Sequence, residues 1–422
     1  MRLLLLISLL LLGGCVEKIV KPDTTPRPTP PAPAACRCEP VETLPPLQIP
    51  EVERYVPPPA LPAEAPKGNE YGLLRKSDWS ALTGLEQDSL AAAWGALQQS
   101  CSVLKKRDPW RTACDAIAKS AGADPATLQG VLRAHFVPHQ VMNPDGTDTG
   151  LITGYYEPLL KGSRTRTERH RYPLYARPDD MVSIDLGSIY PELGNRRLRG
   201  KLSGNKLTPY YSRAEIDVIQ SPLVGKELLW VDDVVDLFFL QIQGSGYIVL
   251  ENGEGLHVGY ADQNGQPYQS IGKVLIERGE LTADKASMQG IKDWGRRNPD
   301  KLRELLNTNP SYVFFRELPQ GLSGPLGALG VPIAAERSLA IDPRYIPLGA
   351  PVYLSTTYPN SNQPLQRLMV AQDTGGAIKG AVRADFFWGA GVEAGQKAGA
   401  MKQRDSRMWV LLPQGWTPNG SK

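Results

Sequence analysis

Three aspartates in the C-terminal third of the chain have the surroundings of catalytic carboxylates. Asp342, Asp373 and Asp385 each lie in or directly after a short stretch that is typical of a β-strand. Asp342 and Asp373 are followed at once by a turn-forming residue, and at such a strand end a side chain faces a cleft. A single aspartate of this kind is best explained as the cap of a turn. Three together indicate a site, and carboxylates do general acid–base chemistry when burial or a neighbouring charge shifts their pKa.

Other kinds of site fit this segment less well. Asp373-Thr374-Gly375 has the form of an aspartic-protease motif, but that chemistry needs two aspartates that share a proton, and we expect no such dyad. The glycine-rich run 375–380 lacks the spacing and the following Ser or Thr of a phosphate-binding loop. None of the four histidines is spaced with cysteine or acidic residues as metal ligands are. The sequence therefore predicts neither a metal nor a cofactor.

Short β-rich segments must position these side chains, with helices gathered in the first folded part. Apolar residues recur at helical spacing over 77–105, and Asp124-Pro125 is typical of the cap and first turn of a helix over 128–136. Further helices are expected at 271–278 and 288–297, and strands at 151–156, 228–231, 238–243, 247–250, 351–354 and 408–412. Many short strands without regular alternation of strand and helix favour barrels or sandwiches.

The N-terminus predicts export and a lipid anchor. Met1-Arg2 and the mainly apolar segment 3–12 are typical of a secretory signal that is too short to span a bilayer. Residues 11–15, Leu-Leu-Gly-Gly-Cys, resemble a bacterial lipobox, in which Cys15 is lipidated and becomes the first mature residue after removal of 1–14. An N-terminal cluster of acyl chains anchors a protein stably. Val16 follows in place of aspartate, which predicts sorting to the outer membrane.

A proline-rich segment separates this anchor from the folded part. Of 38 prolines, 15 lie between Pro22 and Pro66, so 15–67 is expected to be an extended stalk, with a proline-motif ligand as the weaker alternative. Cys36 and Cys38 within it are either unpaired or bonded to another chain. Cys101 and Cys114 flank a turn between two helix-like segments, where an oxidising periplasm is compatible with a disulfide but does not require one. A formal net charge of +3 excludes an acidic disordered protein and a strongly basic nucleic-acid binder.

Several motifs resemble one known family. The segments 341–349 (IDPRYIPLG), 371–380 (AQDTGGAIKG) and 384–389 (ADFFWG) resemble the three-aspartate module of the membrane-bound lytic murein transglycosylase A family. The segments 153–158 (TGYYEP), 239–246 (FLQIQGSG) and 267–272 (PYQSIG) are similar to that family as well. The similarity extends over nearly everything from about Gly72 to Pro413, and only the stalk falls outside it.

The resemblance implies a mainly β protein with some helices and two domains. A double-psi β-barrel domain would be formed from 68–157 and 319–422, with the three-aspartate module in 337–413. A second barrel-like domain, 158–318, would be inserted between these parts, and a groove at the junction would hold a glycan strand. The family cleaves the β-1,4 bond between N-acetylmuramic acid and N-acetylglucosamine in peptidoglycan and leaves a 1,6-anhydro end. Implied partners are glycan strands, the outer membrane through the lipid, and other cell-wall enzymes, with the protein facing the periplasm of a Gram-negative bacterium.

Carried over by motif, the catalytic acid and base is Asp385, with Asp373 as a supporting carboxylate. One residue suffices because the substrate's own C6 hydroxyl replaces water as the nucleophile. We expect the pKa of Asp385 to be raised by the apolar residues 386–388 and by repulsion from Asp373. Substrate contacts are expected from Lys379, Thr153, Tyr155, Gln243, Ser245 and Trp388, although Trp388 is equally compatible with packing in the barrel. Asp342 is expected to be structural. The competing hypothesis is a non-catalytic peptidoglycan-binding lipoprotein.

Overall fold

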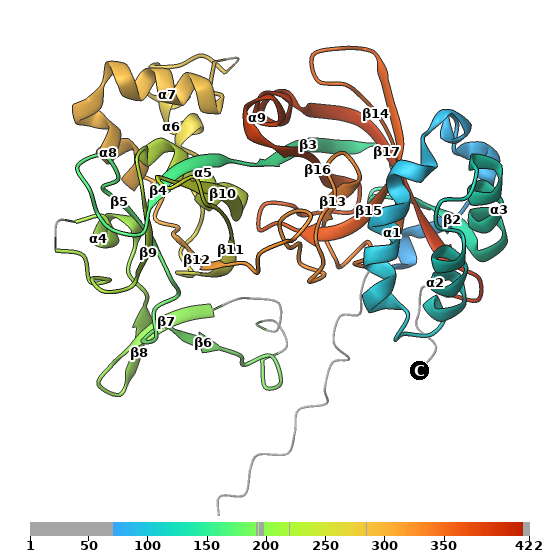
Figure 1. Ribbon diagram of the computed structural model, residues 1–422, viewed down its shortest axis with the longest axis horizontal. Helices are drawn as coiled ribbons and strands as arrows, with labels where there is room; N and C mark the ends of the chain where they lie inside the picture. Colours follow the sequence, from blue (N-terminus) through green and yellow to red (C-terminus); the bar gives the residue numbers. More distant parts are fainter. Residues whose placement is uncertain (1–70, 191–192, 194–197, 219, 284, 417–422) are drawn as a thin grey trace, which may run out of the picture. The chain divides into compact units, whose positions relative to one another are not determined.

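A computed structural model describes residues 71–416, apart from 191–192, 194–197, 219 and 284 (Figure 1). The predictions about the signal peptide, Cys15, the stalk, Cys36 and Cys38 concern residues outside this part of the chain. The described residues belong to one compact unit. They form two closed β-barrels and a set of helices, which confirms the predicted mainly β class with two domains.

The first barrel is a closed sheet of six strands. Their order is β17-β14-β15-β13-β16-β3, and β3 also pairs with β17, which closes the sheet. The strands are β3 (Gly150–Glu157), β13 (Ser338–Ile341), β14 (Pro351–Thr357), β15 (Pro364–Thr374), β16 (Arg383–Ala390) and β17 (Lys402–Pro413). Strands β2 (Phe136–Val141) and β1 (Leu74–Lys76) extend the sheet beyond β17. Both ends of the folded chain thus contribute to this barrel.

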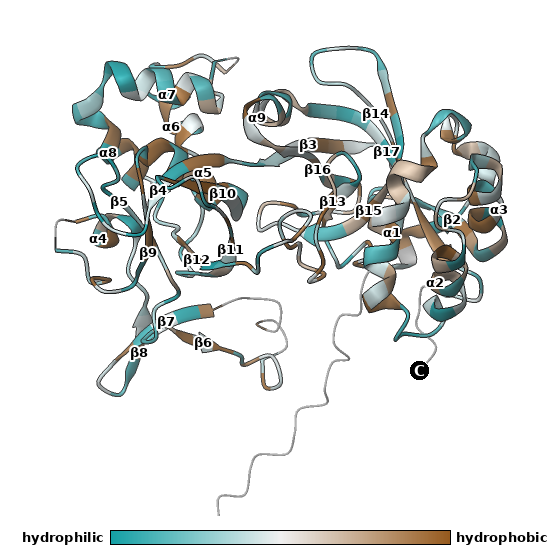
Figure 2. Ribbon diagram, in the orientation of Figure 1, coloured by the Kyte–Doolittle hydropathy of each residue, from teal (hydrophilic) through white to brown (hydrophobic). Residues whose placement is uncertain are grey.

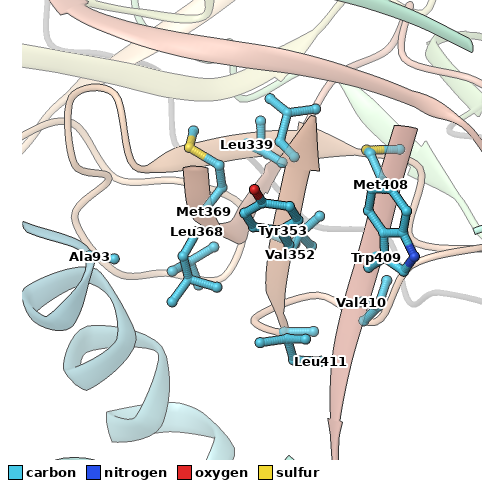
Figure 3. Packing of buried hydrophobic residues seen from close by; sticks show 14 of the residues in the cluster. Ala93, Leu339, Val352, Tyr353, Leu368, Met369, Met408, Trp409, Val410 and Leu411 are labelled. Carbon is cyan, nitrogen blue, oxygen red and sulfur yellow. The ribbon is translucent and has the colours of Figure 1, made fainter. Parts of the chain in front are cut away.

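Apolar side chains fill the first barrel and the layer between its sheet and the N-terminal helices. Val352, Leu368 and Val410 are fully buried there. Helix α1 (Leu90–Leu104) packs against β15, and Figure 3 shows Ala93 of this helix on the same side of the cluster as Leu368. Helices α2 (Trp110–Lys119) and α3 (Pro125–His135) pack against α1. Helix α1, with α2 and α3 packed on it, therefore covers β15, the strand that carries Asp373 near its end.

Two local predictions in this layer can be checked. Asp124 caps α3, because its Oδ1 accepts hydrogen bonds from the N–H groups of Ala126 and Thr127 at 3.0 and 3.1 Å, which confirms the predicted cap. Cys101 in α1 and Cys114 in α2 form a disulfide. The sequence was compatible with either state of this pair, and the structure has the bonded one.

The second barrel is also a closed sheet of six strands, in the order β12-β11-β10-β4-β9-β5. A bridge between Ala176, just after β5, and Phe315 in β12 joins its two edges. The strands are β4 (Leu159–Ser163), β5 (Tyr172–Tyr175), β9 (Glu227–Val231), β10 (Ser245–Leu250), β11 (Gly255–Gln263) and β12 (Val313–Glu317). Leu229, Val231, Ile248 and Val258 form the centre of its core. Consecutive strands β3 and β4 belong to different barrels, and the chain crosses between them at Pro158.

Smaller elements surround the second barrel. Helix α5 (Val234–Gln243) shares a separate apolar cluster with α6 (Ile271–Glu277), α7 (Met288–Arg297) and α8 (Pro299–Asn307). A three-stranded sheet consists of β6 (Val182–Ile184), β7 (Leu198–Ser203) and β8 (Lys206–Pro209), and α4 (Arg213–Ile216) follows it. Helix α9 (Gly391–Ala400) packs on β3 and β16 of the first barrel. The helices expected at 271–278 and 288–297 are confirmed.

The predicted strand at 238–243 is wrong, since these residues form the end of α5. Asp233 caps that helix by accepting hydrogen bonds from the N–H groups of Val235 and Asp236, and Gly244, at φ +80°, ends it. The run is hydrophobic over most of its length (Figure 2), because the helix packs against both the second barrel and the α6–α8 cluster. A continuous apolar run does not distinguish a strand from a buried helix.

The helix predicted over 77–105 begins only at Leu90. Short 3-10 helices occupy Trp79–Ala81 and Leu85–Gln87, after another at Tyr71–Leu73. Gly84 lies between the first two with φ +87°, a left-handed conformation that a continuing α-helix does not contain. The apolar residues with helical spacing thus lie in two short 3-10 helices and in α1, not in one continuous helix.

The disulfide should stabilise the layer that covers β15. We expect the double variant C101A/C114A to lose about 3 kcal/mol of the free energy of unfolding. The disulfide closes the loop between residues 101 and 114 and so lowers the conformational entropy of the unfolded chain. Guanidinium unfolding followed by circular dichroism measures the loss. The reduced wild-type protein is the control and should resemble the variant. Equal stability of the oxidised wild type and the variant would contradict the expectation.

Candidate functional site

Four residues form one row across four neighbouring strands of the first barrel. In the β-ladder Thr153 of β3 pairs with Asp385 of β16, Asp385 pairs with Ala340 of β13, and Ala340 pairs with Asp373 of β15. Side chains of paired residues lie on the same face of a sheet, and adjacent strands are about 4.8 Å apart, so the Cα atoms of the two aspartates are roughly 10 Å apart. Ala340 places only a methyl group between them. The row thus brings together two carboxylates and a hydroxyl from distant parts of the sequence.

Asp385 is held in a state that favours its protonated form. The hydroxyl of Thr153 donates a hydrogen bond to Oδ1 of Asp385. Burial raises the pKa of Asp385 and the negative charge of Asp373 adds to this, while the Thr153 hydrogen bond and the charge of Arg383 act in the opposite direction. The net direction is upward. Burial and the second carboxylate therefore both contribute, and of the expected apolar residues 386–388 only Phe387 has the same strand parity as Asp385.

Asp373 has the larger number of hydrogen-bond donors. Its Oδ1 accepts from the backbone N–H groups of Ala328 and Thr374, both at 2.9 Å, and its Oδ2 accepts from the hydroxyl of Tyr155 at 3.1 Å. Burial raises the pKa of Asp373 as well, and these three hydrogen bonds oppose the rise. Three donors stabilise a carboxylate better than one does. When the two carboxyl groups hold one proton between them, the three donors to Asp373 favour the state in which Asp373 is charged and Asp385 is protonated.

Strand β3 supplies donors to both carboxylates. Thr153 and Tyr155 are two residues apart and therefore lie on the same face of the strand. Gly154 lies between them and faces the opposite side, where a Cβ atom would come within 2.8 Å of Nε1 of Trp388 and of the Cα of Ala398. The Thr-Gly-Tyr sequence thus combines two donors on the site face with a close approach of α9 on the other.

Two contributors to the site are missing from the predicted site residues, and only one of them has a signal in the sequence. The amide of Ala328 lies in a loop of apolar residues and glycines, and no side chain there indicates that a backbone N–H will reach a carboxylate. Arg383 has the same strand parity as Asp385 on β16, and its guanidinium donates to the carbonyl oxygens of Leu151 and Ala384. Its proximity to Asp385 could have been suspected, because residues two apart in a strand share a face.

Asp342 and Lys379 lie at the loop after β15. Asp342 is 1% exposed; its Oδ2 accepts hydrogen bonds from Nη2 of Arg344 at 2.6 Å and from the N–H of Gly380 at 3.0 Å. These contacts attach the loop to the end of β13, in keeping with a structural role. Lys379 is exposed, and the described residues provide no salt bridge to it. Its contact with substrate remains a prediction.

Trp388, Gln243 and Ser245 do not join the row of carboxylates. Trp388 is 4% exposed and packs in the core, with its ring centroid 4.5 Å from that of Phe386. Gln243, at the end of α5, accepts a hydrogen bond from the N–H of Tyr156 at 3.1 Å and so connects α5 to β3. Ser245 begins β10 of the second barrel. Their roles as substrate contacts also remain predictions, and the burial of Trp388 agrees with its alternative role in packing.

A second Asp-Thr-Gly occurs at 148–150, so the aspartic-protease alternative needs a structural test. The Oδ2 atom of Asp148 accepts hydrogen bonds from Nε2 of Gln140 and Nε of Arg407, at 2.8 and 2.9 Å. Asp373 instead binds Tyr155, Ala328 and Thr374. The two motifs therefore do not form a proton-sharing dyad.

Two cavities lie away from this row, and neither is lined by Asp373 or Asp385. One of about 570 Å³ lies beside Asp88 and Arg337, and one of about 360 Å³ lies beside Tyr247 and His257. Within the described ranges, no group of three histidine, cysteine or acidic side chains is arranged to hold a metal ion. No helix in that part of the chain is long and apolar enough to cross a membrane.

Comparison with known proteins identifies the family. The model of the MltA specific insert domain matches residues 151–316, and that of the 3D domain matches residues 337–412. Membrane-bound lytic murein transglycosylase A of Escherichia coli (strain K12) is 35% identical over 279 residues, which are 64% of this chain and 68% of the relative. The chain belongs to the membrane-bound lytic murein transglycosylase A family.

Solved structures of lytic transglycosylases have the same architecture. The match to MltA from Neisseria gonorrhoeae has 38% identity and a TM-score of 0.71, and covers 82% of this chain and 93% of that one. The match to E. coli MltA with bound chitohexaose has 29% identity and a TM-score of 0.61, and covers 81% and 94%. A lytic transglycosylase of Burkholderia pseudomallei is 46% identical, with a TM-score of 0.58 and coverage of 81% and 96%.

The hydrogen bond from Tyr155 should stabilise the charged form of Asp373. We expect Tyr155→Phe to raise the pKa of Asp373, because the carboxylate loses one of its three donors while remaining partly buried. Titration of side-chain carboxyl carbons by ¹³C NMR measures this, with Asp373→Asn to assign the signal. Tyr156→Phe is a matched control, because the Tyr156 hydroxyl contacts Sδ of Met288 instead. An unchanged titration of Asp373 in Tyr155→Phe would contradict the assignment.

Proposed function

We propose that this protein is a peptidoglycan lytic transglycosylase that cleaves the bond between N-acetylmuramic acid and N-acetylglucosamine and leaves a 1,6-anhydro end. The observation that carries the proposal is the unequal hydrogen bonding of two neighbouring carboxylates, Asp385 with Thr153 and Asp373 with three donors. Membership of the lytic murein transglycosylase A family supports it. The chitohexaose bound to the E. coli protein indicates that a β-1,4-linked glycan is the ligand class.

In the proposed reaction Asp385 acts first as an acid and then as a base. Protonated Asp385 gives its proton to the glycosidic oxygen while the bond from that oxygen to C1 of the muramic acid breaks. The resulting carboxylate then takes the proton from the C6 hydroxyl as O6 forms a bond to C1. Asp385 ends the cycle protonated, and no water is consumed. A raised pKa suits both steps, because it increases the protonated fraction of Asp385 at a given pH and makes its conjugate base stronger.

Asp373 supports this cycle as a fixed negative charge. Its three donors occupy most of the roughly four acceptor positions of a carboxylate. Little capacity is left for it to accept a proton from an attacking water. It is instead placed to raise the proton affinity of Asp385 and to stabilise positive charge that develops on the sugar ring.

The groove is proposed to lie at the junction of the two barrels. We place the domain borders at 157/158 and 318/319, consistent with the change of sheet between β3 and β4 and with the insert-domain match that ends at residue 316. The N–H of Tyr156 bonds to Gln243, and Oε1 of Glu157 lies 2.8 Å from Nδ1 of His257. These contacts support the idea that β3 runs from beside Asp385 directly to the inserted domain. Lys379 and Ser245 are proposed to contact sugar from opposite sides of such a groove.

The proposed location is the periplasmic face of the outer membrane. The relatives are named membrane-bound, and Cys15 supplies a lipid anchor for this chain if its lipobox is processed. The proline-rich segment 15–67 would then hold the enzyme away from the membrane and let it reach glycan strands. If Cys15 is lipidated, the wild-type protein should incorporate radiolabelled palmitate and the variant Cys15→Ala should not.

The acid assignment predicts loss of turnover without loss of binding. For Asp385→Ala we expect the rate to fall on the order of 10²–10⁴-fold, the usual contribution of a general acid–base group, with binding to glycan strands retained. The measurement is mass spectrometry of 1,6-anhydro-muropeptides released from purified sacculi. Asp342→Asn is the comparison variant, and it should lower thermal stability while keeping most of the turnover.

Each outcome of this assay discriminates between the hypotheses. Reducing-end products from the wild type would indicate a hydrolase, and release of no soluble product would favour the non-catalytic binding protein. Anhydro products at the normal rate from Asp385→Ala would refute the choice of acid.

The charge of Asp373 predicts a shift in the pH profile. Activity requires protonated Asp385, so it should fall as pH rises through the pKa of that group. Asp373→Asn removes the negative charge that raises this pKa. We therefore expect the alkaline limb of kcat/KM to move to lower pH, as measured from initial rates across the pH range. A limb that stays in place or moves upward would show that the charge of Asp373 does not act on the acid.

A further inference from the structure

Strand β15 is irregular immediately before Asp373. Ser338 of β13 pairs with Val370 of β15, and Ala340 of β13 pairs with Asp373 of β15. Between these two pairs β13 advances by two residues, whereas β15 advances by three. Strand β15 thus carries one extra residue opposite β13, as in a β-bulge. In a regular ladder Ala340 would pair with Gln372, and Asp373 would turn to the opposite face, because a shift of one residue reverses the side of every side chain. The irregular step is therefore what directs Asp373 into the row with Asp385.

The side chain of Gln372 joins three elements at this step. It is 0% exposed. Its Nε2 donates hydrogen bonds to the carbonyl oxygen of Ala96 at 3.0 Å and to Oγ of Ser100 at 3.2 Å, both in α1. Its Oε1 accepts from Oγ of Ser338, on β13, at 2.6 Å. A buried amide is costly unless its groups are paired, and here both ends of the amide are paired.

The backbone of Gln372 connects the same step to the loop that binds Asp373. Its carbonyl oxygen accepts from the N–H of Leu329 at 3.0 Å, and the preceding residue, Ala328, donates to Oδ1 of Asp373. Gly327 lies so close that a Cβ atom there would be 2.5 Å from the oxygen of Gln372. The loop, helix α1 and β13 thus meet at one residue, which is next to Asp373 in sequence and is not required for proton transfer itself.

We propose that Gln372 is a positioning residue whose side-chain amide holds the irregular step in β15 and so keeps Asp373 in the row with Asp385. This inference rests on the proposed function, because its test measures the pH profile of the transglycosylase activity. It also gives the N-terminal helices a role in the reaction, since α1 supplies two of the three side-chain contacts of Gln372. The N-terminal helices contribute no proposed catalytic group of their own.

The test is a pH profile combined with a double-mutant cycle. Gln372→Met has a similar length but no hydrogen-bonding groups. We expect its kcat/KM to fall on the order of tenfold to a hundredfold, the scale of loss that misplacement of a group in a site produces. We also expect its alkaline limb to move to lower pH, in the direction expected for Asp373→Asn. In the double variant Gln372→Met/Asp373→Asn the limb should lie where Asp373→Asn alone puts it, because Gln372 acts through Asp373.

Two further variants separate positioning from simple stability. Ser100→Ala removes one partner of Gln372 and should move the limb in the same direction by a smaller amount, even if Gln372→Met does not fold. Thr356→Val is the matched control, because the Thr356 and Ser406 hydroxyls form a buried 2.7 Å hydrogen bond elsewhere in the same barrel. The control should lower the melting temperature and leave the limb unchanged.

The possible results are distinct from those that decide the proposed function. If the wild type releases no anhydro products, the proposed function fails and the cycle has no readout. If the wild type is active and both Gln372→Met and Ser100→Ala keep the wild-type limb while losing stability like Thr356→Val, Gln372 is only structural and the inference is overturned. Independent, additive shifts from Gln372→Met and Asp373→Asn would overturn it as well.

Discussion

The site depends on keeping two partly buried carboxylates close together in unequal states. Burial opposes the charge on each of them, and their mutual repulsion adds to this cost. The protein resolves the conflict through the distribution of donors. Asp373 receives two backbone N–H groups and a phenol, whereas Asp385 receives one threonine hydroxyl. The rest of the first barrel can be understood as the scaffold that delivers these donors.

Closure of the first barrel is what makes that delivery possible. Strand β3 comes from the N-terminal part of the folded chain, yet it lies parallel to β16 with Thr153 opposite Asp385, because the sheet closes through the β3–β17 pairing. The same strand then leads through Glu157 into the second barrel, where Glu157 meets His257. A movement of the second barrel would therefore act on the strand that carries both Thr153 and Tyr155. Strand β3 therefore belongs to the site through Thr153 and Tyr155 and to the border of the second barrel through Glu157.

The sequence could reveal the side chains of the site but not the contacts that orient them. Asp373, Asp385, Thr153 and Tyr155 stand in long motifs, and the structure brings these four together. The N–H of Ala328 is a backbone donor, and no pattern of side chains in the sequence indicates it, so only the three-dimensional structure reveals this contact. The extra residue in β15 depends on its pairing with β13, which is distant in sequence. The apolar residues 238–243 predict a strand but form the end of α5, because such a run lacks the periodicity that separates a strand from a buried helix.

The same geometry bears on why a second carboxylate need not make the protein a hydrolase. A hydrolase of the usual kind uses one carboxyl as acid and the other as base or nucleophile, and the second must have free lone pairs directed at water or at C1. Asp373 has committed three of its acceptor positions to Tyr155, Ala328 and Thr374. Loss of these hydrogen bonds would leave a partly buried charge with fewer donors, which is more costly than leaving Asp373 as it is. In the proposed reaction the substrate supplies the nucleophile instead, and the proton of its C6 hydroxyl goes to Asp385, which has just lost one. On this argument the donors around Asp373 favour transglycosylation as much as the position of Asp385 does.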